Sequence, residues 1–382
     1  MKSEWKKVRL GEVAFITDGD HLPPPKTDYG IPFIYISNIE GFNKINFTDC
    51  SYVPEDYYEK IIDKRKVKEN DILYTVVGSY GIPVLVKSET KFCFQRHIAL
   101  IRAEKINSEF LVQALDSGAF RLQADKVAIG EAQKTVTLDN LRKMTINLPP
   151  LSDQLKIAET LSVWDSAIEK TEKLISEKEK LYKGHLNYFY DENENCIKLS
   201  EFAKEIAQRN KNKEVTQVLS VTNKNGFVLP EQQFGKKIAS EDLSNYKIVE
   251  KGQFAYNPSR INVGSIARLD DFDSAVLSPM YTVFEINTNL INSDFFLHWL
   301  SSKYAIHQIK LCAQGGVREI VGFEDFQKMR IKSLSLKEQE KIADFLNIEK
   351  SEISLLKKQL EQYKLQKQGL MQKLLTGEWR IK

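Results

Sequence analysis

The sequence predicts an α/β (α+β) protein with two similar mixed regions, each followed by a long helix. The first observation is a repeat: the octapeptide QLKIAETL at 154–161 returns as QEKIADFL at 339–346, 185 positions later. The second is the heptad spacing of apolar residues after each octapeptide, which is typical of coiled-coil packing. The third is a set of short β-branched and aromatic runs before each octapeptide, which is typical of strands.

Length and composition fit this fold class. A chain of 382 residues is long for one domain and suggests two or three. Hydrophobic residues make up 42% and charged residues 28%, which indicates a folded rather than a disordered protein. The 55 Lys and Arg nearly balance the 52 Asp and Glu. A nucleic-acid binder with this balance would need its cations gathered on one face.

The repeat extends well beyond the octapeptide. INSEF at 106–110 matches INSDF at 291–295 with the same offset, and VRLGEVA at 8–14 matches IKLSEFA at 197–203 with a slightly larger one. Small loop insertions explain such drift without disturbing a fold. A solenoid needs roughly three or more repeats, so two copies indicate a pseudo-dimer instead.

Each copy begins with a mixed region and ends with a long helix. We expect the mixed regions at 1–150 and 191–334, and the long helices at 151–190 and 335–382. Strands are expected at 71–78, 81–86 and 97–103 in the first copy, and at 216–222, 252–258, 264–269 and 280–286 in the second. A shorter helix with an apolar stripe is expected at 108–123, and its counterpart at 293–310.

The long helices have recognisable starts and a shared apolar seam. Ser152 or Asp153 is the expected cap of the first, and Ser335 with Glu338 forms a capping box for the second. The expected seam consists of Leu161, Trp164, Ile168, Ile175 and Tyr182, and of Ile342, Leu346, Ile353, Leu356, Leu360 and Tyr363. We expect the two helices to pack on each other, because both lie in one chain at high effective concentration. The alternative is that each pairs with another protein or another copy.

The sequence contains none of the common catalytic motifs. It has no G-x-x-x-x-G-K-[ST] phosphate loop, no G-x-G-x-x-G turn, no H-E-x-x-H and no G-x-S-x-G. Its four cysteines and five histidines lack metal-ligand spacing, so no metal site is expected. No leader and no run of about 18 apolar residues is apparent, so we expect a cytoplasmic protein. A binding or scaffold protein is favoured over an enzyme.

These features together resemble the specificity (S) subunits of type I restriction–modification enzymes. They are the duplicated mixed region, the helix starts LPPLSDQLKIAETL at 148–161 and LSLKEQEKIADFL at 334–346, and the closing GLMQKLLTGEWRIK at 369–382. The stretch ITDGDHLPPPKTDYGIPFIYISNI at 16–39 is similar to a loop common in such recognition domains. The resemblance covers essentially the whole chain.

The resemblance implies a DNA-reading role without catalysis. Each mixed region would be a target recognition domain for one half of a bipartite, asymmetric double-stranded DNA sequence. The long helices would form an antiparallel intramolecular coiled coil that holds the domains apart. Two methyltransferase subunits would use S-adenosylmethionine to methylate adenine N6, and two translocase/nuclease (restriction) subunits would use ATP and Mg. This chain itself would hold no cofactor, and the complex would serve DNA methylation and phage defence.

Candidate DNA-binding residues follow from chemistry. Base edges are read by Arg, Lys, Asn or Gln on loops, and phosphates are held by Lys, Arg and small hydroxyl residues. In the first copy the candidates are His21, Lys26, Tyr29, Lys91, Gln95, Arg96, His97, Gln133 and Lys134. In the second they are Arg209, Lys211, Lys213, Asn257, Ser259, Arg260, Asn262, Ser278, Gln314, Gly315, Gly316 and Arg318. An ordinary Ω-loop, a hairpin edge, a turn or a solvated charge run is the structural alternative for each group.

Other functions stay open on the sequence alone. A coiled-coil scaffold without a DNA role predicts no salt-dependent DNA binding, whereas phosphate contacts make affinity fall steeply with salt. An enzyme with an unrecognised motif predicts activity from the isolated chain. A specificity subunit for a fused methyltransferase–nuclease differs from the main interpretation only in its partner.

Overall fold

The computed structural model describes residues 5–21, 24–191, 195–223, 225–230, 242–313 and 320–381. The chain divides into two compact units, Met1–Glu172 with Gln359–Lys382, and Lys173–Lys358. Each unit therefore contains one mixed α/β region and a stretch of both long helices, which confirms the predicted fold class. No helix in the described part of the chain is long and apolar enough to span a membrane.

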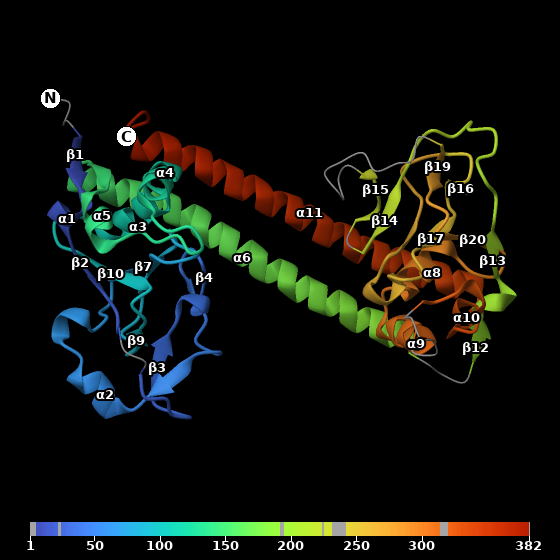
Figure 1. Ribbon diagram of the computed structural model, residues 1–382, viewed down its shortest axis with the longest axis horizontal. Helices are drawn as coiled ribbons and strands as arrows, with labels where there is room; N and C mark the ends of the chain where they lie inside the picture. The colour runs from blue at the N-terminus through green and yellow to red at the C-terminus, as the bar shows by residue number, and fades with distance from the viewer. Residues whose placement is uncertain are drawn as a thin grey trace. The chain divides into compact units, whose positions relative to one another are not determined.

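Unit 1 holds eleven named strands and five short α-helices among its described residues (Figure 1). The strands are β1 (Lys6–Arg9), β2 (Ala14–Asp18), β3 (Ile31–Ile34), β4 (Ile39–Gly41), β5 (Lys44–Ile45), β6 (Ser51–Val53), β7 (Ile72–Thr75), β8 (Pro83–Leu85), β9 (Cys93–Phe94), β10 (Ile98–Ala103) and β11 (Thr145–Leu148). The helices are α1 (Leu10–Val13), α2 (Glu55–Lys60), α3 (Ser108–Asp116), α4 (Gly118–Val127) and α5 (Leu138–Lys143).

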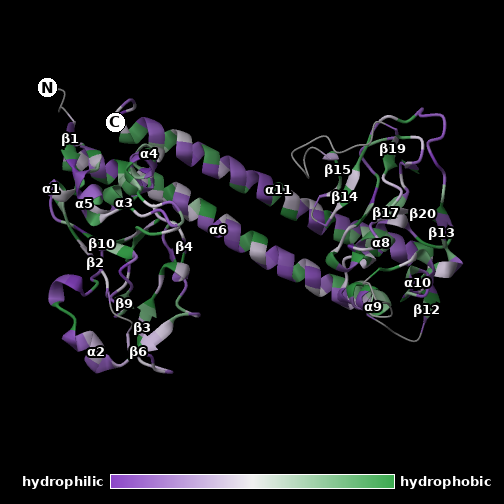
Figure 2. Cartoon of the chain, in the orientation of Figure 1, coloured by the Kyte–Doolittle hydropathy of each residue, from purple (hydrophilic) through white to green (hydrophobic). Residues whose placement is uncertain are grey.

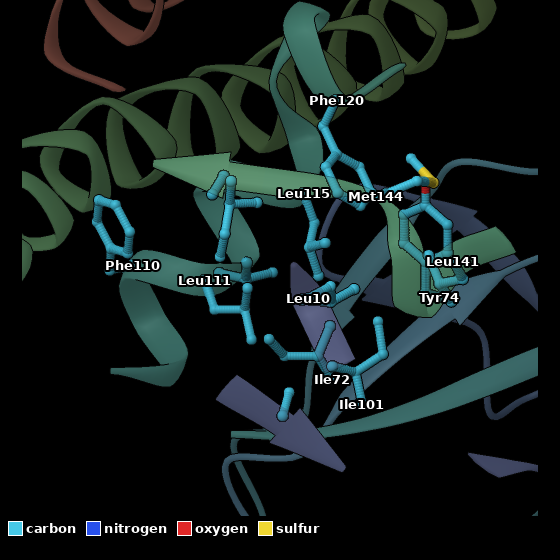
Figure 3. Close-up of a cluster of buried hydrophobic side chains, with 14 of the residues drawn as sticks. Leu10, Ile72, Tyr74, Ile101, Phe110, Leu111, Leu115, Phe120, Leu141 and Met144 are labelled. Atoms are coloured by element: carbon cyan, nitrogen blue, oxygen red, sulfur yellow. The ribbon is translucent and has the colours of Figure 1, made fainter. Parts of the chain in front are cut away.

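An antiparallel four-stranded sheet with the order β2-β10-β7-β8 is the centre of unit 1. Ile101 of β10 lies opposite Ile16 on one side and Ile72 on the other, and all three are buried. Figure 3 shows Ile72 and Ile101 in the same buried cluster as Leu111 and the other labelled side chains of α3. A three-stranded sheet, β6-β3-β9, and the pairs β4-β5 and β1-β11 complete the unit.

Unit 2 repeats this plan. Its strands are β12 (Cys196–Lys198), β13 (Ala203–Ile206), β14 (Ser220–Thr222), β15 (Gly226–Val228), β16 (Lys247–Glu250), β17 (Phe254–Tyr256), β18 (Ile266–Arg268), β19 (Ser274–Leu277), β20 (Thr282–Ile286) and β21 (Arg330–Lys332). Its short helices include α8 (Ser293–Trp299), α9 (Lys303–Ala313) and α10 (Phe323–Phe326). The sheet order β13-β20-β17-β18 matches β2-β10-β7-β8, and the pair β12-β21 matches β1-β11. The pairs β14-β15 and β16-β19 take the place of the second sheet of unit 1.

The repeated sequence makes repeated hydrogen bonds. Gln154 accepts from Asn107 N at 2.8 Å and donates to Pro149 O, while Gln339 accepts from Asn292 N at 2.7 Å and donates to Leu334 O. Both glutamines are almost fully buried. The repeated octapeptide thus begins with the side chain that fixes each long helix to its mixed region.

The long helices are α6 (Leu151–Phe189) and α11 (Leu336–Leu375). Figure 2 shows hydrophilic and hydrophobic residues interspersed along both. In unit 1, the rings of Trp164 and Tyr363 lie 5.9 Å apart, and in unit 2, Nζ of Lys178 lies 2.7 Å from Glu352. Pairing of later α6 residues with earlier α11 residues makes the helices antiparallel. All eleven predicted seam residues are buried or half-buried.

Each mixed region packs on both long helices. The core of unit 1 contains Leu161 of α6 and Met371 of α11. The core of unit 2 contains Leu346 of α11 and Leu186 of α6, which occupy the matching positions of the repeat. Each core is therefore assembled from both halves of the chain.

Several expected boundaries were wrong. The helix expected at 108–123 breaks at Ser117, whose side chain caps α4 by accepting from Phe120 N. Its counterpart breaks in the same place, between α8 and α9.

The ends of the long helices were predicted only in part. Helix α6 starts at Leu151, so Ser152 and Asp153 lie inside its first turn rather than at the cap. The capping box of Ser335 and Glu338 is confirmed, and α11 ends at Leu375, before Gly377 with its φ of +75°.

Candidate nucleic-acid interface

Most first-copy candidates lie at one end of the central sheet of unit 1. Strand β2 ends at Asp18, β7 ends at Thr75 and β10 begins at Ile98, and because neighbours are antiparallel these points share one edge. Arg96 N donates to Asp20 O at 3.0 Å, and Val76 N donates to His97 O at 2.9 Å. The loops beyond the three strands are therefore tied side by side.

A fourth loop docks on this edge. Residues 129–135 form a tight loop in which Ile129 bridges to Thr135, and Thr135 also bridges to Val77. Gly78 N donates to Lys134 O at 2.8 Å, which holds the loop against the end of β7. We define the first edge as residues 18–21, 76–80, 95–97 and 129–135. It brings together the predicted residues His21, Gln95, Arg96, His97, Gln133 and Lys134.

Two cations of the first edge are available to a ligand. Arg96 and Lys134 are exposed, and neither side chain forms a hydrogen bond or ion pair with any described residue. His21, by contrast, contacts Asp18 at 2.7 Å, and Asp18 also binds Arg65 at 3.1 Å. The guanidinium and the ammonium are therefore the donors that an anionic partner would meet first.

The polar groups between these cations suit base recognition. Burial, and then the charge of Arg96, lowers the pKa of His97. A neutral imidazole offers one donor and one acceptor. Gln95 is half-buried, and its Oε1 accepts from Ile36 N at 3.4 Å, which leaves its amide N–H groups to donate elsewhere.

The remaining first-copy candidates lie with the second sheet of unit 1. Thr27, next to Lys26, bridges to Tyr52 of β6, and Nζ of Lys26 lies 6.0 Å from the ring centroid of Tyr35. Tyr29 follows in the same segment and is 84% exposed. Lys91 is held by Glu59 at 3.7 Å and lies over the ring of Tyr58. These three residues are not brought onto the first edge.

The second-copy candidates gather at the matching end of the unit 2 sheet. Strand β13 ends at Ile206, β17 ends at Tyr256 and β20 begins at Thr282. We define the second edge as residues 207–213, 257–265 and 278–281. Asn257 N donates to Ser265 O and Ser265 N to Arg260 O, so the loop after β17 is closed on itself.

The second edge also presents free cations. Arg260 and Lys211 are exposed, and within the described ranges neither side chain makes a hydrogen bond or ion pair. Arg209 instead donates to Asn245 O at 2.8 Å, and Lys213 pairs with Asp242 at 3.1 Å. These two side chains hold the loop and are less available.

Small polar residues flank these cations. Asn257 Oδ1 accepts from Ser259 N at 3.0 Å, and Ser259 itself is exposed. Asn262 and Ser278 are half-buried at the same edge. Gln314, Gly315, Gly316 and Arg318 lie outside the described residues. The described residue Val321, shortly after them, donates to Pro258 O at 3.0 Å.

Sequence reasoning missed part of each edge. Gly78 and Ser79 are exposed in the loop after β7, which corresponds to the loop 257–265 after β17 on the second edge. They contain no cation, but aligning the two copies strand by strand would have found them. Met280, 61% exposed, lies 3.9 Å from the Asn257 amide through its sulfur. No group of three or more metal-ligating side chains occurs among the residues that the structure describes.

Comparison with known proteins gives consistent matches. Residues 2–179 match the family model of the type I restriction modification DNA specificity domain. The type I restriction enzyme MjaVIII specificity subunit of Methanocaldococcus jannaschii is 31% identical over 192 residues, 48% of this chain and 45% of that protein. The chain thus matches less than half the length of this relative. The putative MjaX specificity subunit of the same organism is 24% identical over 416 residues, 99% of this chain and 94% of that protein.

Solved structures share the fold. The crystal structure of the type I restriction–modification S subunit from M. genitalium has a TM-score of 0.62 at 18% identity, covering 98% of this chain and 96% of that chain. A chain from a structure of the type I restriction–modification system has a TM-score of 0.55 at 16% identity, covering 97% of both. The family model spans the first mixed region and most of α6, and the MjaX relative spans both copies. Residues 2–179 are thus similar to the type I restriction modification DNA specificity domain, and the whole chain is similar to a putative type I specificity subunit.

Proposed function

We propose that each edge reads one half of a split double-stranded DNA target. The observation that supports this most is the placement of exposed cations at matching ends of two equivalent sheets. In the described residues, the exposed cations that make no side-chain hydrogen bond or ion pair are Arg96 and Lys134 on the first edge, and Lys211 and Arg260 on the second. Two edges with the same strand arrangement but different side chains suit a target made of two different half-sites.

The chemistry of both edges suits DNA. An arginine donates two hydrogen bonds to guanine O6 and N7, and glutamine or asparagine pairs in the same way with adenine. Lysines on the same loops neutralise phosphates and release counterions, which supplies much of the affinity. Gln95 with Arg96, and Asn257 with Arg260, combine both kinds of donor at one place. The lysines would then position the protein while these polar pairs select the sequence.

The long helices would set the gap between half-sites. Helix α6 has 39 residues, and a rise of about 1.5 Å per residue gives it a length of roughly 58 Å. One major groove returns to the same side of DNA about every 34–36 Å. Inserting whole helical turns into both helices should therefore lengthen the unread spacer while both half-sites stay unchanged. An unaltered spacer would contradict this role.

The catalytic work would belong to partner subunits. The sequence contains none of the four common catalytic motifs named above, and the family model that matches residues 2–179 is that of a DNA specificity domain. We infer that two methyltransferase subunits dock here and methylate adenine N6 with S-adenosylmethionine. Two translocase/nuclease subunits that use ATP and Mg would complete the restriction enzyme. The chain itself would then need no cofactor.

Methylation mapping tests the proposal directly. The chain is co-expressed with its methyltransferase subunit, separate or fused to a nuclease, in a host without adenine methylation, and N6-methyladenine is sequenced genome-wide. We expect two specified blocks around a fixed gap. Arg96→Ala should relax one block and Arg260→Ala the other, because each removes up to one bidentate base contact worth about 1–3 kcal/mol.

Matched controls lie at the opposite ends of the same sheets. Lys105 follows β10 and Lys251 precedes β17, and both are exposed. Lys105→Ala and Lys251→Ala should leave both blocks and the salt dependence unchanged. An assembled complex that neither methylates DNA nor binds it at any salt concentration would contradict the proposed function and favour the coiled-coil scaffold instead.

A further inference from the structure

Two ion pairs between the long helices are copies of a single contact. In unit 1, Nζ of Lys364 lies 3.1 Å from Glu172, and in unit 2, Nζ of Lys357 lies 2.6 Å from Glu179. Glu172 and Lys357 are 185 positions apart, as are Glu179 and Lys364. The repeat therefore converts one pair into the other. In both, the acid comes from α6 and the base from α11.

This arrangement has a consequence for self-pairing. If α6 packed on a second α6 in the same register, Glu172 would face Glu179 of the copy, and this would happen twice. If α11 packed on a second α11, Lys357 would face Lys364 of the copy, also twice. We call the paired long helices the stem. Like charges in contact repel, so a stem made of two α6 helices, or of two α11 helices, loses two attractive ion pairs and gains two repulsive contacts.

A third contact has the same preference and is buried. Lys367 of α11 is 6% exposed, and its Nζ lies 2.6 Å from Asp165 of α6 and 3.6 Å from Asp116 of α3. The repeat places Tyr182 at the position of Lys367, and Lys350 at the position of Asp165. Two first halves would leave both carboxylates without their cation, and two second halves would set Lys367 beside Lys350 of the copy. An uncompensated buried charge is far costlier than an exposed one.

We propose that these three contacts form a pairing code between the halves of the chain. The α6 face of the first half, residues 1–191, selects the α11 face of a second half, residues 195–382, and rejects another α6. The partner can come from the same chain or from another copy of it. The code concerns assembly of the stem and is independent of DNA binding, so its failure and that of the proposed function are separate results.

The test starts from the intact, folded chain. A protease site is inserted between Asp191 and Asn195, the purified protein is cut, and preparations with different tags are mixed at a urea concentration that allows exchange. Scrambling of tags between identical halves shows that exchange is complete. Native mass spectrometry then counts mixed pairs and same-half pairs. We expect the ratio of mixed pairs to same-half pairs to exceed its random value of about one to one by about tenfold or more.

One substitution should shift the balance toward self-pairing. Glu179→Lys turns the mixed contact with Lys357 into a repulsion, and turns both contacts between two first halves into attractions with Glu172. We expect the ratio of first-half pairs to mixed pairs to rise about tenfold over wild type. Glu177→Lys is the matched control, since Glu177 is exposed, makes no ion pair with a described residue and undergoes the same charge change. Adding Lys357→Glu to Glu179→Lys should restore the mixed pair.

Two results from the cut chain would overturn the proposal. Wild-type halves that pair in random proportion would overturn it, as would equal ratios for Glu179→Lys and Glu177→Lys. The apolar seam alone would then set the pairing. The uncut chain gives a second measurement: the double swap at 179 and 357 should unfold closer to wild type than either single substitution, and a merely additive loss would also overturn the proposal.

Discussion

Removing the cation of Lys367 should destabilise unit 1 more than removing any exposed lysine of the stem. Its Nζ contacts Asp165 and Asp116, and lies 4.1 Å from the ring centroid of Phe42. Lys367→Met keeps most of the side-chain volume and deletes the charge. Two carboxylates then stay in a site built for a cation, and Gln113 is left as a hydrogen-bond donor to Asp165.

The magnitude follows from burial. Taking away one partner of a buried ion pair costs roughly 3–5 kcal/mol, because the remaining charge is desolvated without compensation. For a domain of about 150–250 residues each kcal/mol lowers Tm by roughly 2–4 °C, so the expected loss is roughly 6–20 °C. Lys364→Met is the control: its side chain is 44% exposed and pairs with Glu172, so it should cost only about 0.2–1 kcal/mol.

Calorimetry on both variants at neutral pH measures the difference. Neutralising the acids should rescue the protein, so Lys367→Met combined with Asp165→Asn and Asp116→Asn should regain most of the lost Tm. Two results would refute the reasoning. One is a Lys367→Met variant no less stable than Lys364→Met, and the other is a triple variant no more stable than Lys367→Met alone.

Three further predictions concern the contacts between the mixed regions and the long helices, and the first edge. Burial, and then the charge of Asp165, raises the pKa of Asp116 from 3.8 to about 6, so the folded chain holds more protons than the unfolded chain between these values. Stability should therefore fall as pH rises from about 4 to about 6, by roughly 1–3 kcal/mol, and Asp116→Asn should flatten this slope in a series of urea unfolding curves. Gln339→Ala removes three hydrogen bonds between a buried side chain and partly buried backbone groups, and should cost roughly 3 kcal/mol in urea unfolding, whereas Gln366→Ala on the exposed face of α11 should cost little. Gly19→Ala would bring a Cβ within 2.0 Å of Phe94 O and displace the first edge, so mapping should show one half-site blurred and the other intact.

The periodic elements were predictable because their signals are local. The heptads located α6 and α11, and the β-branched runs located β7, β10, β17 and β20. The breaks after α3 and α8 were not predictable from the apolar stripe. At a serine such as Ser117 the chain can either continue one helix or end it and cap a new one. Packing against the core, which the local sequence does not reveal, determines which of the two forms.

The partners of polar seam residues lay beyond sequence reasoning. Lys367 stands at a seam position, which predicts an interruption of the apolar seam. The carboxylates that contact Lys367 belong to Asp165, about two hundred positions earlier in the chain, and to Asp116 in a separate short helix. A period identifies which face of a helix is buried, but it does not say which residue of another element meets a given side chain.

The site was predictable as chemistry and only partly as geometry. Arg96, Lys134 and Arg260 were chosen for residue type and for lying on loops, and strand order then placed them on matching edges. Lys91 has the same chemistry, but its ammonium is held by Glu59 beside the second sheet. Only the fold separates a cation that is already paired within the protein from one that is available to a ligand.

The interleaved cores limit how a recognition region can be replaced. The first core takes Leu161 from α6 and Met371 from α11, so a foreign region must suit both surfaces. The repeat shows which surfaces these are, since Leu346 and Leu186 occupy the matching positions in the second core. A replacement that preserves the asparagine cap held by Gln154 and the apolar face toward these residues keeps the joint intact. One mixed region can therefore be exchanged while the contacts between the long helices stay the same, and under the proposed function the gap between half-sites would stay the same as well.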